Sequence, residues 1–160
     1  FERSCVLQGY TMNGSLHGPD GEKNVYITVN EDKDKNPREV FVQVGNAGSV
    51  EAAYNQTIGR FISKLLQQGS TVENVVSKLI NTRSNEVGWC YLDPSDEKPV
   101  NAESVQDLIG KFLRRRYIDN KEIIEGTGVK CPKCKRYTFK RTTDGCWECS
   151  NPDCEASNCN

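Results

Sequence analysis

Apolar and polar residues alternate in two segments of the first third of the chain. Residues 24–30 direct Val25, Ile27 and Val29 to one side and their neighbours to the other, and residues 40–44 repeat the pattern with valines. A period of two residues is typical of β-strands that bury one face. The sequence therefore predicts two half-buried strands here.

A further strand is predicted before them, because an apolar-rich stretch runs from Val6 to Met12 and stops at Asn13-Gly14. The turn residues His17-Gly18-Pro19-Asp20-Gly21 follow, and a charged turn from Glu31 to Pro37 separates the two later strands. Short turns between consecutive strands favour antiparallel pairing. We therefore predict an antiparallel meander.

The apolar period changes to that of a helix after Gly45. Helices are predicted from Ser49 to Gly69, from Ser70 to Ile80 and from Ser104 to Tyr117. Ser49 can cap the first helix, and Ser70-Thr71-Val72-Glu73 is a capping box at the start of the second. The residues expected to face the core are Val50, Ala53, Tyr54, Thr57, Ile58, Phe61, Ile62, Leu65 and Leu66 in the first helix, Val72, Val75, Val76, Leu79 and Ile80 in the second, and Val105, Leu108, Ile109, Phe112 and Leu113 in the third.

The strands precede the helices along the chain, and a polar loop from Ser84 to Pro99 comes before the last helix. Strands and helices that are segregated in this way are typical of α+β domains. We predict an α+β fold, with helices packed on one face of an antiparallel sheet, followed by a small zinc ribbon. The predicted divisions are a domain over residues 1–118, a linker over 119–130 and the ribbon over 131–160.

Length and charge limit the classes of function. The chain has 160 residues and a formal net charge of −1, which argues against a polycation that coats nucleic acid. No uninterrupted stretch of about 18 apolar residues occurs, so no membrane segment is expected. No charged-then-apolar leader is visible either. Because the cysteines are also clustered, as discussed next, we expect a cytoplasmic protein without a membrane partner.

Six of the eight cysteines lie within residues 131–159, whereas Cys5 and Cys90 are isolated. Clustered cysteines at short spacings favour a metal site over a disulfide scaffold, whose cysteines would be spread through the fold. Structural Zn²⁺ prefers four thiolates in a tetrahedron, and two short loops can each supply a pair. The favoured zinc ligands are Cys131, Cys134, Cys149 and Cys154. A rival set uses Cys146 with Cys149 as the second pair, and spacing alone leaves this choice open.

Two cysteines, Cys146 and Cys159, are left over by the favoured ligand set. A thiol pair near the end of the sequence can carry reducing equivalents by thiol–disulfide exchange, and nearby lysines and arginines would favour the thiolate form. The alternative is that these two cysteines are an additional metal ligand and a surface thiol without a function. Spacing does not separate these two interpretations.

Several segments together resemble a known family. Residues 39–49, continued by 58–66, resemble the TSCPD domain, which lies near the carboxyl terminus of adenosylcobalamin-dependent (class II) ribonucleotide reductases. Residues 26–32 are similar to the strand before that region, and 75–80 and 104–113 to later helices of the family. The cysteine-rich tail is similar to the end of the same reductases, although its second cysteine pair is more widely spaced.

The resemblance implies a redox role for the tail. In the reductases, tail cysteines re-reduce the active-site disulfide, a role that would fall here on Cys146 and Cys159. The implied partners are a reductase catalytic domain and a thioredoxin-like reductant. The catalytic barrel with its radical cysteine has no counterpart in this sequence, so we predict no catalytic residue and expect adenosylcobalamin only in the parent enzyme.

The first functional hypothesis is therefore an accessory region, or a stand-alone relative, of a class II ribonucleotide reductase. An alternative is a zinc-ribbon module that binds nucleic acid or a small (cyclic) nucleotide, such as a protein of viral origin that captures a nucleotide signal. A third hypothesis is a purely structural interaction domain. A homo-oligomer is compatible with all of them.

The glycine-rich turn before the first helix is the candidate phosphate site. Backbone N–H groups at a helix start can hold a phosphate, and Arg60 would assist if it lies near the turn. A tight turn with close packing also explains the glycines, and so short a motif favours that structural explanation. The candidate nucleotide-binding residues are Gly45, Asn46, Gly48, Ser49 and Arg60.

Other charged and aromatic residues are interpreted structurally. The arginines at 114–116 suit the end of a helix dipole, and acidic residues nearly cancel the positive charge of the ribbon. His17 is the only histidine and lies in a predicted turn, so no Ser–His or Cys–His catalytic arrangement is expected. Trp89 and Cys90 are interpreted as packing residues.

Overall fold

The chain divides into two compact units, Phe1–Arg115 and Arg116–Asn160. The computed structural model describes residues 1–119, 131–134, 139–149, 151 and 154–158. The predicted linker, 119–130, lies outside the described residues except for Asp119. Among the helices of the described part, none has the length and apolar character needed to cross a bilayer.

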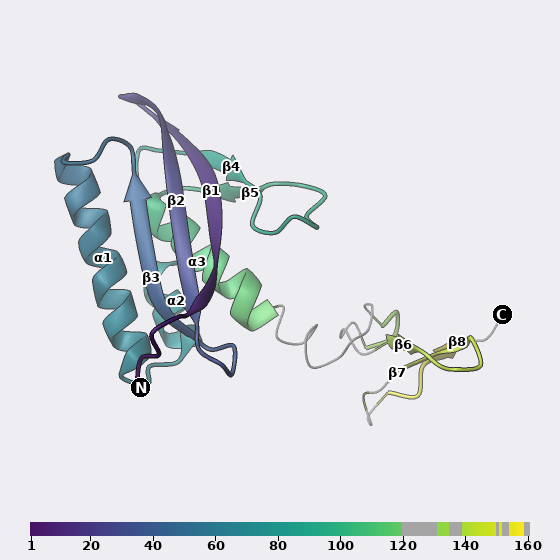
Figure 1. The fold of residues 1–160 in the computed structure, drawn as a ribbon. Coiled ribbons are helices and arrows are strands. Elements are labelled where there is room, and N and C mark those ends of the chain that lie inside the picture. The colour runs from purple at the N-terminus through teal and green to yellow at the C-terminus, as the bar shows by residue number, and fades with distance from the viewer. Residues whose placement is uncertain (120–130, 135–138, 150, 152–153, 159–160) are drawn as a thin grey trace. The chain divides into compact units, whose positions relative to one another are not determined.

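An antiparallel sheet with the order β1-β2-β3 forms one layer of the first unit (Figure 1). Its strands are β1 (Gln8–Gly18), β2 (Gly21–Glu31) and β3 (Pro37–Val44). The predicted meander is confirmed, but β1 is longer than predicted and includes both Asn13-Gly14 and His17. Every residue of β1 is paired with a residue of β2, so strand pairing overrides the local turn preference of Asn-Gly.

Three α-helices follow the sheet along the chain, namely α1 (Val50–Gln67), α2 (Val72–Leu79) and α3 (Val105–Arg114). A π-helical turn, η1 (Arg115–Asp119), continues α3. Ser49 caps α1 as predicted, and Ser104 caps α3, because each side chain accepts a hydrogen bond from the first turn. Thr71 caps α2, one residue later than the predicted Ser70.

The region predicted as a polar loop contains a short hairpin. Its strands are β4 (Gly88–Cys90) and β5 (Val100–Ala102), which pair in antiparallel register. The bridge between His17 and Val87 links the start of this hairpin to the end of β1. Strands of three residues are too short to show an alternating pattern in the sequence, which explains why the hairpin was not predicted.

The core lies between one face of the sheet and the helices α2 and α3, which lie on the same side of it (Figure 1). The largest fully buried apolar side chains are Leu16, Val25, Ile27, Val29, Val40 and Val42 in the sheet and Leu108, Ile109 and Leu113 in α3. The predicted α+β fold is therefore confirmed. All the inward residues predicted for α3 are buried, and Asp107 and Gly110 are buried with them.

Helix α1 lies along the free edge of β3 rather than over a face of the sheet (Figure 1). The hydroxyl of Ser63 accepts a hydrogen bond of 2.8 Å from the backbone N–H of Val40. The amide of Gln67 donates to the backbone carbonyl of Arg38 at 3.2 Å. These side chains satisfy backbone groups that an edge strand would otherwise leave open.

The predicted buried stripe of α1 is wrong at most positions. The buried residues of the helix are Ala52, Asn55, Gly59, Ile62 and Leu66. By contrast, Val50, Tyr54 and Phe61 expose 67–69% of their surface. The close approach of α1 to β3 requires glycine at position 59, because a Cβ atom there would lie 2.8 Å from the carbonyl oxygen of Val40. The helix thus has an apolar face that no described residue covers.

The substitution Gly59→Ala tests this close approach. In an open helix, alanine would stabilise the protein by about 1 kcal/mol relative to glycine. Here we expect a loss of about 1–3 kcal/mol, because the added methyl group overlaps the backbone of β3. Thermal unfolding followed by circular dichroism measures the change, with the exposed Thr57→Ala as the control. A higher melting temperature for Gly59→Ala would contradict the observed packing of α1.

The second unit contains a small antiparallel sheet with the order β6-β7-β8. Its strands are β6 (Phe139–Arg141), β7 (Trp147–Cys149) and β8 (Ser157–Asn158). A turn closes the β6–β7 hairpin, where the N–H of Thr142 donates to the carbonyl of Cys146 at 2.7 Å. This hairpin positions one half of the cysteine group described next.

Candidate metal centre

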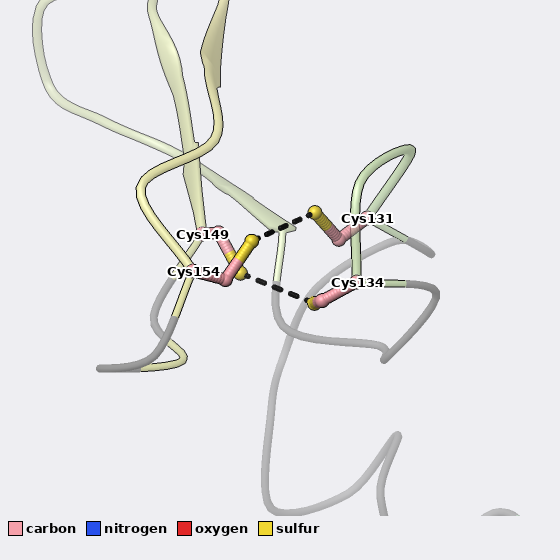
Figure 2. A group of neighbouring side chains, drawn as sticks. All are labelled: Cys131, Cys134, Cys149 and Cys154. Atoms are coloured by element: carbon pink, nitrogen blue, oxygen red, sulfur yellow. Dashed lines mark hydrogen bonds between the residues drawn. The ribbon is translucent and has the colours of Figure 1, made fainter.

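Four cysteines from two loops converge in the second unit (Figure 2). The sulfur of Cys131 lies 3.9 Å from that of Cys154, and the sulfur of Cys134 lies 3.7 Å from that of Cys149. All four sulfur atoms lie within 4.8 Å of one another. The structure thus brings together the four residues that cysteine spacing favoured.

The local fold explains how the second pair reaches this point. Cys149 ends β7, opposite Phe139 of β6, and its N–H donates to the carbonyl of Ala156 at 2.9 Å. The N–H of Cys154 donates to the carbonyl of Asn151 at 2.9 Å. The small sheet therefore fixes Cys149, and this hydrogen bond links Cys154 to Asn151, two residues after Cys149.

The core around these cysteines is small. Its buried members among the described residues are Cys131, Phe139 and Cys154. The ring of Trp147 stacks on that of Phe139, with centroids 5.6 Å apart and planes inclined by 15°. A lobe with so little buried apolar surface is typical of units that depend on a metal ion or disulfides.

All four cysteines of the group are free thiols. Burial and the hydrogen-bonded neighbouring thiols raise the pKa of Cys154 to about 11. Four thiolates this close together require a cation between them, because like charges in contact disfavour ionisation. Soft sulfur ligands suit Zn²⁺, Cu⁺ and iron–sulfur clusters. The group therefore forms a site that could bind a metal ion.

Cys146 lies outside this group. It precedes the extended residues of β7 by one position, and residues three apart along an extended backbone point to opposite sides. The rival ligand set, which pairs Cys146 with Cys149, is therefore not the set that the structure assembles. Cys146 is instead disulfide-bonded. The other predicted redox cysteine, Cys159, lies outside the described residues.

A comparison with protein families concerns the first unit. The family model of the TSCPD domain matches residues 7–117, which is more than half of the chain. The chain belongs to the TSCPD domain family. Neither the comparison with curated proteins nor that with solved structures gave a match. The TSCPD domain here thus comprises the sheet and the three α-helices, and the cysteine group lies beyond the matched residues.

The glycine-rich turn of the TSCPD domain joins β3 to α1. Gly45 and Gly48 adopt positive φ angles of 56° and 87°, which glycine tolerates at a tight turn. The N–H of Gly45 donates to the carbonyl of Asn24, and that of Ser49 donates to the carbonyl of Asn46. The hydroxyl of Ser49 accepts the capping hydrogen bond of α1. These contacts agree with a structural role for the turn.

The structure does not bring Arg60 to this turn. Arg60 lies ten residues beyond Val50 in α1, a distance of about 15 Å along the helix axis. It lines a groove of about 440 Å³ between α1 and β3 instead. The groove is lined by Glu39, Val40, Phe41, Val42, Gln43, Gln56, Arg60, Ser63, Lys64 and Gln67. Sequence reasoning missed this groove, because only the placement of α1 at the edge of β3 creates it.

The remaining interpretations have mixed outcomes. Cys90 is buried as predicted, and burial raises the pKa of its thiol. Trp89 is 66% exposed, so its interpretation as a packing residue is wrong.

Arg115 forms an ion pair of 2.7 Å with Asp96, which gives one of the three consecutive arginines a structural role. In the ribbon, Lys140 lies opposite Glu148, so positive charge is offset there.

Proposed function

We propose that this chain is an accessory region, or a stand-alone relative, of a class II ribonucleotide reductase, whose ribbon delivers reducing equivalents to a catalytic domain. The observation that carries the proposal is the disulfide at Cys146, outside a group of four free thiols. Membership of the TSCPD family supports it, because this domain is associated with ribonucleotide reductases.

Zinc is the proposed occupant of the four-cysteine group. A tetrahedron with sulfur atoms about 2.3 Å from the metal has edges of about 3.8 Å between sulfur atoms. Two of the six sulfur–sulfur separations, 3.7 and 3.9 Å, fit this value, and all six lie within 4.8 Å. A disulfide would require about 2.05 Å. Zinc has no redox chemistry of its own, so its role here is to hold the ribbon together.

The proposed partner of Cys146 is Cys159, the other cysteine to which the family resemblance assigns the redox role. In the reduced pair, one thiolate attacks the disulfide of the acceptor, forms a mixed disulfide and releases an acceptor thiolate. The second thiolate then breaks the mixed disulfide and closes the bond between Cys146 and Cys159. Two electrons and two protons pass to the acceptor, and a thioredoxin-like dithiol restores the pair.

A coupled assay with thioredoxin, thioredoxin reductase and NADPH tests the redox pair. We expect the oxidised chain to consume one equivalent of NADPH and to retain its metal ion, because only one disulfide is reduced. Cys146→Ser and Cys159→Ser should each abolish this consumption. Cys5→Ser, at an exposed free thiol, is the matched control and should leave it unchanged. Equal consumption by Cys146→Ser and the unsubstituted chain would contradict the proposal.

A second assay tests the proposed acceptor. A class II catalytic domain that lacks its own tail cysteines should complete many turnovers when this chain and a thioredoxin system are added. With Cys146→Ser, turnover should stop after the active-site disulfide has formed once. If the chain cycles its disulfide but supports no repeated turnover, the assignment to ribonucleotide reductase is wrong.

A further inference from the structure

The groove between β3 and α1 in the TSCPD domain has two distinct walls. Side chains alternate along a strand, so β3 directs Glu39, Phe41 and Gln43 to the face of the sheet opposite the core. Helix α1 supplies the second wall, chiefly through Arg60 and Lys64. Because α1 lies alongside β3, the two walls run side by side (Figure 1).

The helix wall carries positive charge without a counterion. Arg60 and Lys64 lie one helical turn apart, about 6 Å along the axis, and like charges at this spacing destabilise a helix. Neither forms an ion pair with any residue that the structure describes. The acid in the groove, Glu39, already accepts hydrogen bonds from Arg3 at 2.6 Å and Asn30 at 3.0 Å. The groove is therefore suited to an anionic group from outside.

The strand wall carries an exposed aromatic ring. Phe41 exposes 54% of its surface on the open face of the sheet, and the register of β2 with β3 makes Tyr26 its diagonal neighbour. Exposed rings on the open face of a sheet are a common platform for stacking flat bases. Gln43 and Gln56 line the same groove, and each amide offers a donor and an acceptor for the edge of a base.

A peptide strand does not suit this groove. Peptides that add to a sheet need free backbone groups at its edge. Here, Ser63 and Gln67 of α1 already bond to the backbone of β3. The ligand must therefore be recognised by the ring, the amides and the two cations.

We propose that this groove binds a nucleotide unit, with its base stacked on Phe41 and its phosphate held between Arg60 and Lys64. The groove volume of about 440 Å³ lies within the range of small-molecule sites, about 300–1,000 Å³. A free mononucleotide and one residue of a single-stranded nucleic acid present the same chemistry. The proposal does not depend on the ribbon or on its redox chemistry.

Titrations with adenosine monophosphate and with a short oligothymidylate, followed by NMR of the full chain, test the proposal. We expect the amide signals of β3 and of the middle of α1 to shift with at least one probe. Phe41→Ala should weaken binding at least about fivefold, because stacking is lost. Arg60→Gln should also weaken binding and, for the oligonucleotide, reduce the salt dependence by about one phosphate contact.

Matched controls lie outside the groove. Phe61→Ala removes an exposed ring of α1 that does not line the groove, and Lys78→Gln removes an exposed cation from α2. Neither should change binding, and thermal melting checks that all variants remain folded. Tighter binding of the oligonucleotide would identify single strands as the ligand, and equal or tighter binding of the monophosphate would identify free nucleotides.

Three results would overturn the proposal. The first is the absence of binding by either probe at millimolar concentration. The second is binding that Phe41→Ala leaves unchanged, or that inorganic phosphate reproduces with the same affinity. The third is an equal loss of binding in Phe61→Ala or Lys78→Gln. None of these results bears on the proposed redox pair, which lies in the other unit.

Discussion

Replacement of Cys131 by serine is expected to unfold the ribbon while the TSCPD domain stays folded. The buried core of the ribbon among the described residues consists of Cys131, Phe139 and Cys154, which is too little apolar surface for independent stability. In such lobes the binding of zinc supplies the folding free energy, about 10–16 kcal/mol in zinc-finger peptides at pH 7. Removal of the proposed zinc ion by a strong chelator should have the same effect.

Bound metal and the fluorescence of Trp147 measure this result. The second tryptophan, Trp89, is exposed in the first unit, so Trp89→Phe isolates the signal of Trp147 without removing a buried side chain. Loss of the stacking between Trp147 and Phe139 should accompany loss of the metal. Cys5→Ser should retain both signals. A reduced, metal-free chain that keeps the native fluorescence would disprove the dependence on zinc.

Substitution of Asp107 by alanine should have the largest effect on the TSCPD domain. This carboxylate is fully buried at the start of α3, where it accepts hydrogen bonds from the backbone N–H groups of Asn81 at 2.7 Å and Glu103 at 3.0 Å. Lys111 lies 2.9 Å from it as an ion-pair partner. Alanine would leave all three donors without this acceptor, so we expect a loss of about 3–5 kcal/mol in urea unfolding.

The pH dependence of stability gives an independent check on Asp107. Burial disfavours its charged form, but the hydrogen bonds from Glu103, Lys111 and Asn81 outweigh burial and hold its pKa below the ordinary value. A lowered folded-state pKa stabilises the protein above the unfolded-state value, about 3.9, and this stabilisation disappears as pH falls through the folded-state pKa. Stability should therefore decrease below about pH 4.

The isosteric variant Asp107→Asn separates charge from shape. Asparagine has no titrating group, so the stability of the variant should fall less steeply in acid than that of the unsubstituted chain. The stability of the variant should still decrease with falling pH, since Asp32 and Glu39 also have lowered pKa values and remain in the variant. If stability decreased equally steeply with falling pH in both proteins, Asp107 would not contribute as described.

The sequence by itself determined the order and type of the main elements. The alternation of Val25, Ile27 and Val29 fixes which face of β2 is buried, because a period of two leaves only one apolar side. The apolar period of α3 likewise points its inward residues to the core. The cysteine spacing determined the candidate ligand set to within two choices. Local patterns are sufficient in these cases because each element has a single apolar face.

Tertiary structure alone decided the features that depend on contacts between distant segments. Helix α1 has two faces with apolar residues, and the close approach to β3 selects the face that carries Gly59. The extended backbone of β7 excludes Cys146 from the four-thiol group. The groove with Phe41 and Arg60 exists only because α1 lies at the edge of β3. Periodicity and spacing give the faces that an element offers, but packing geometry determines which of them is used.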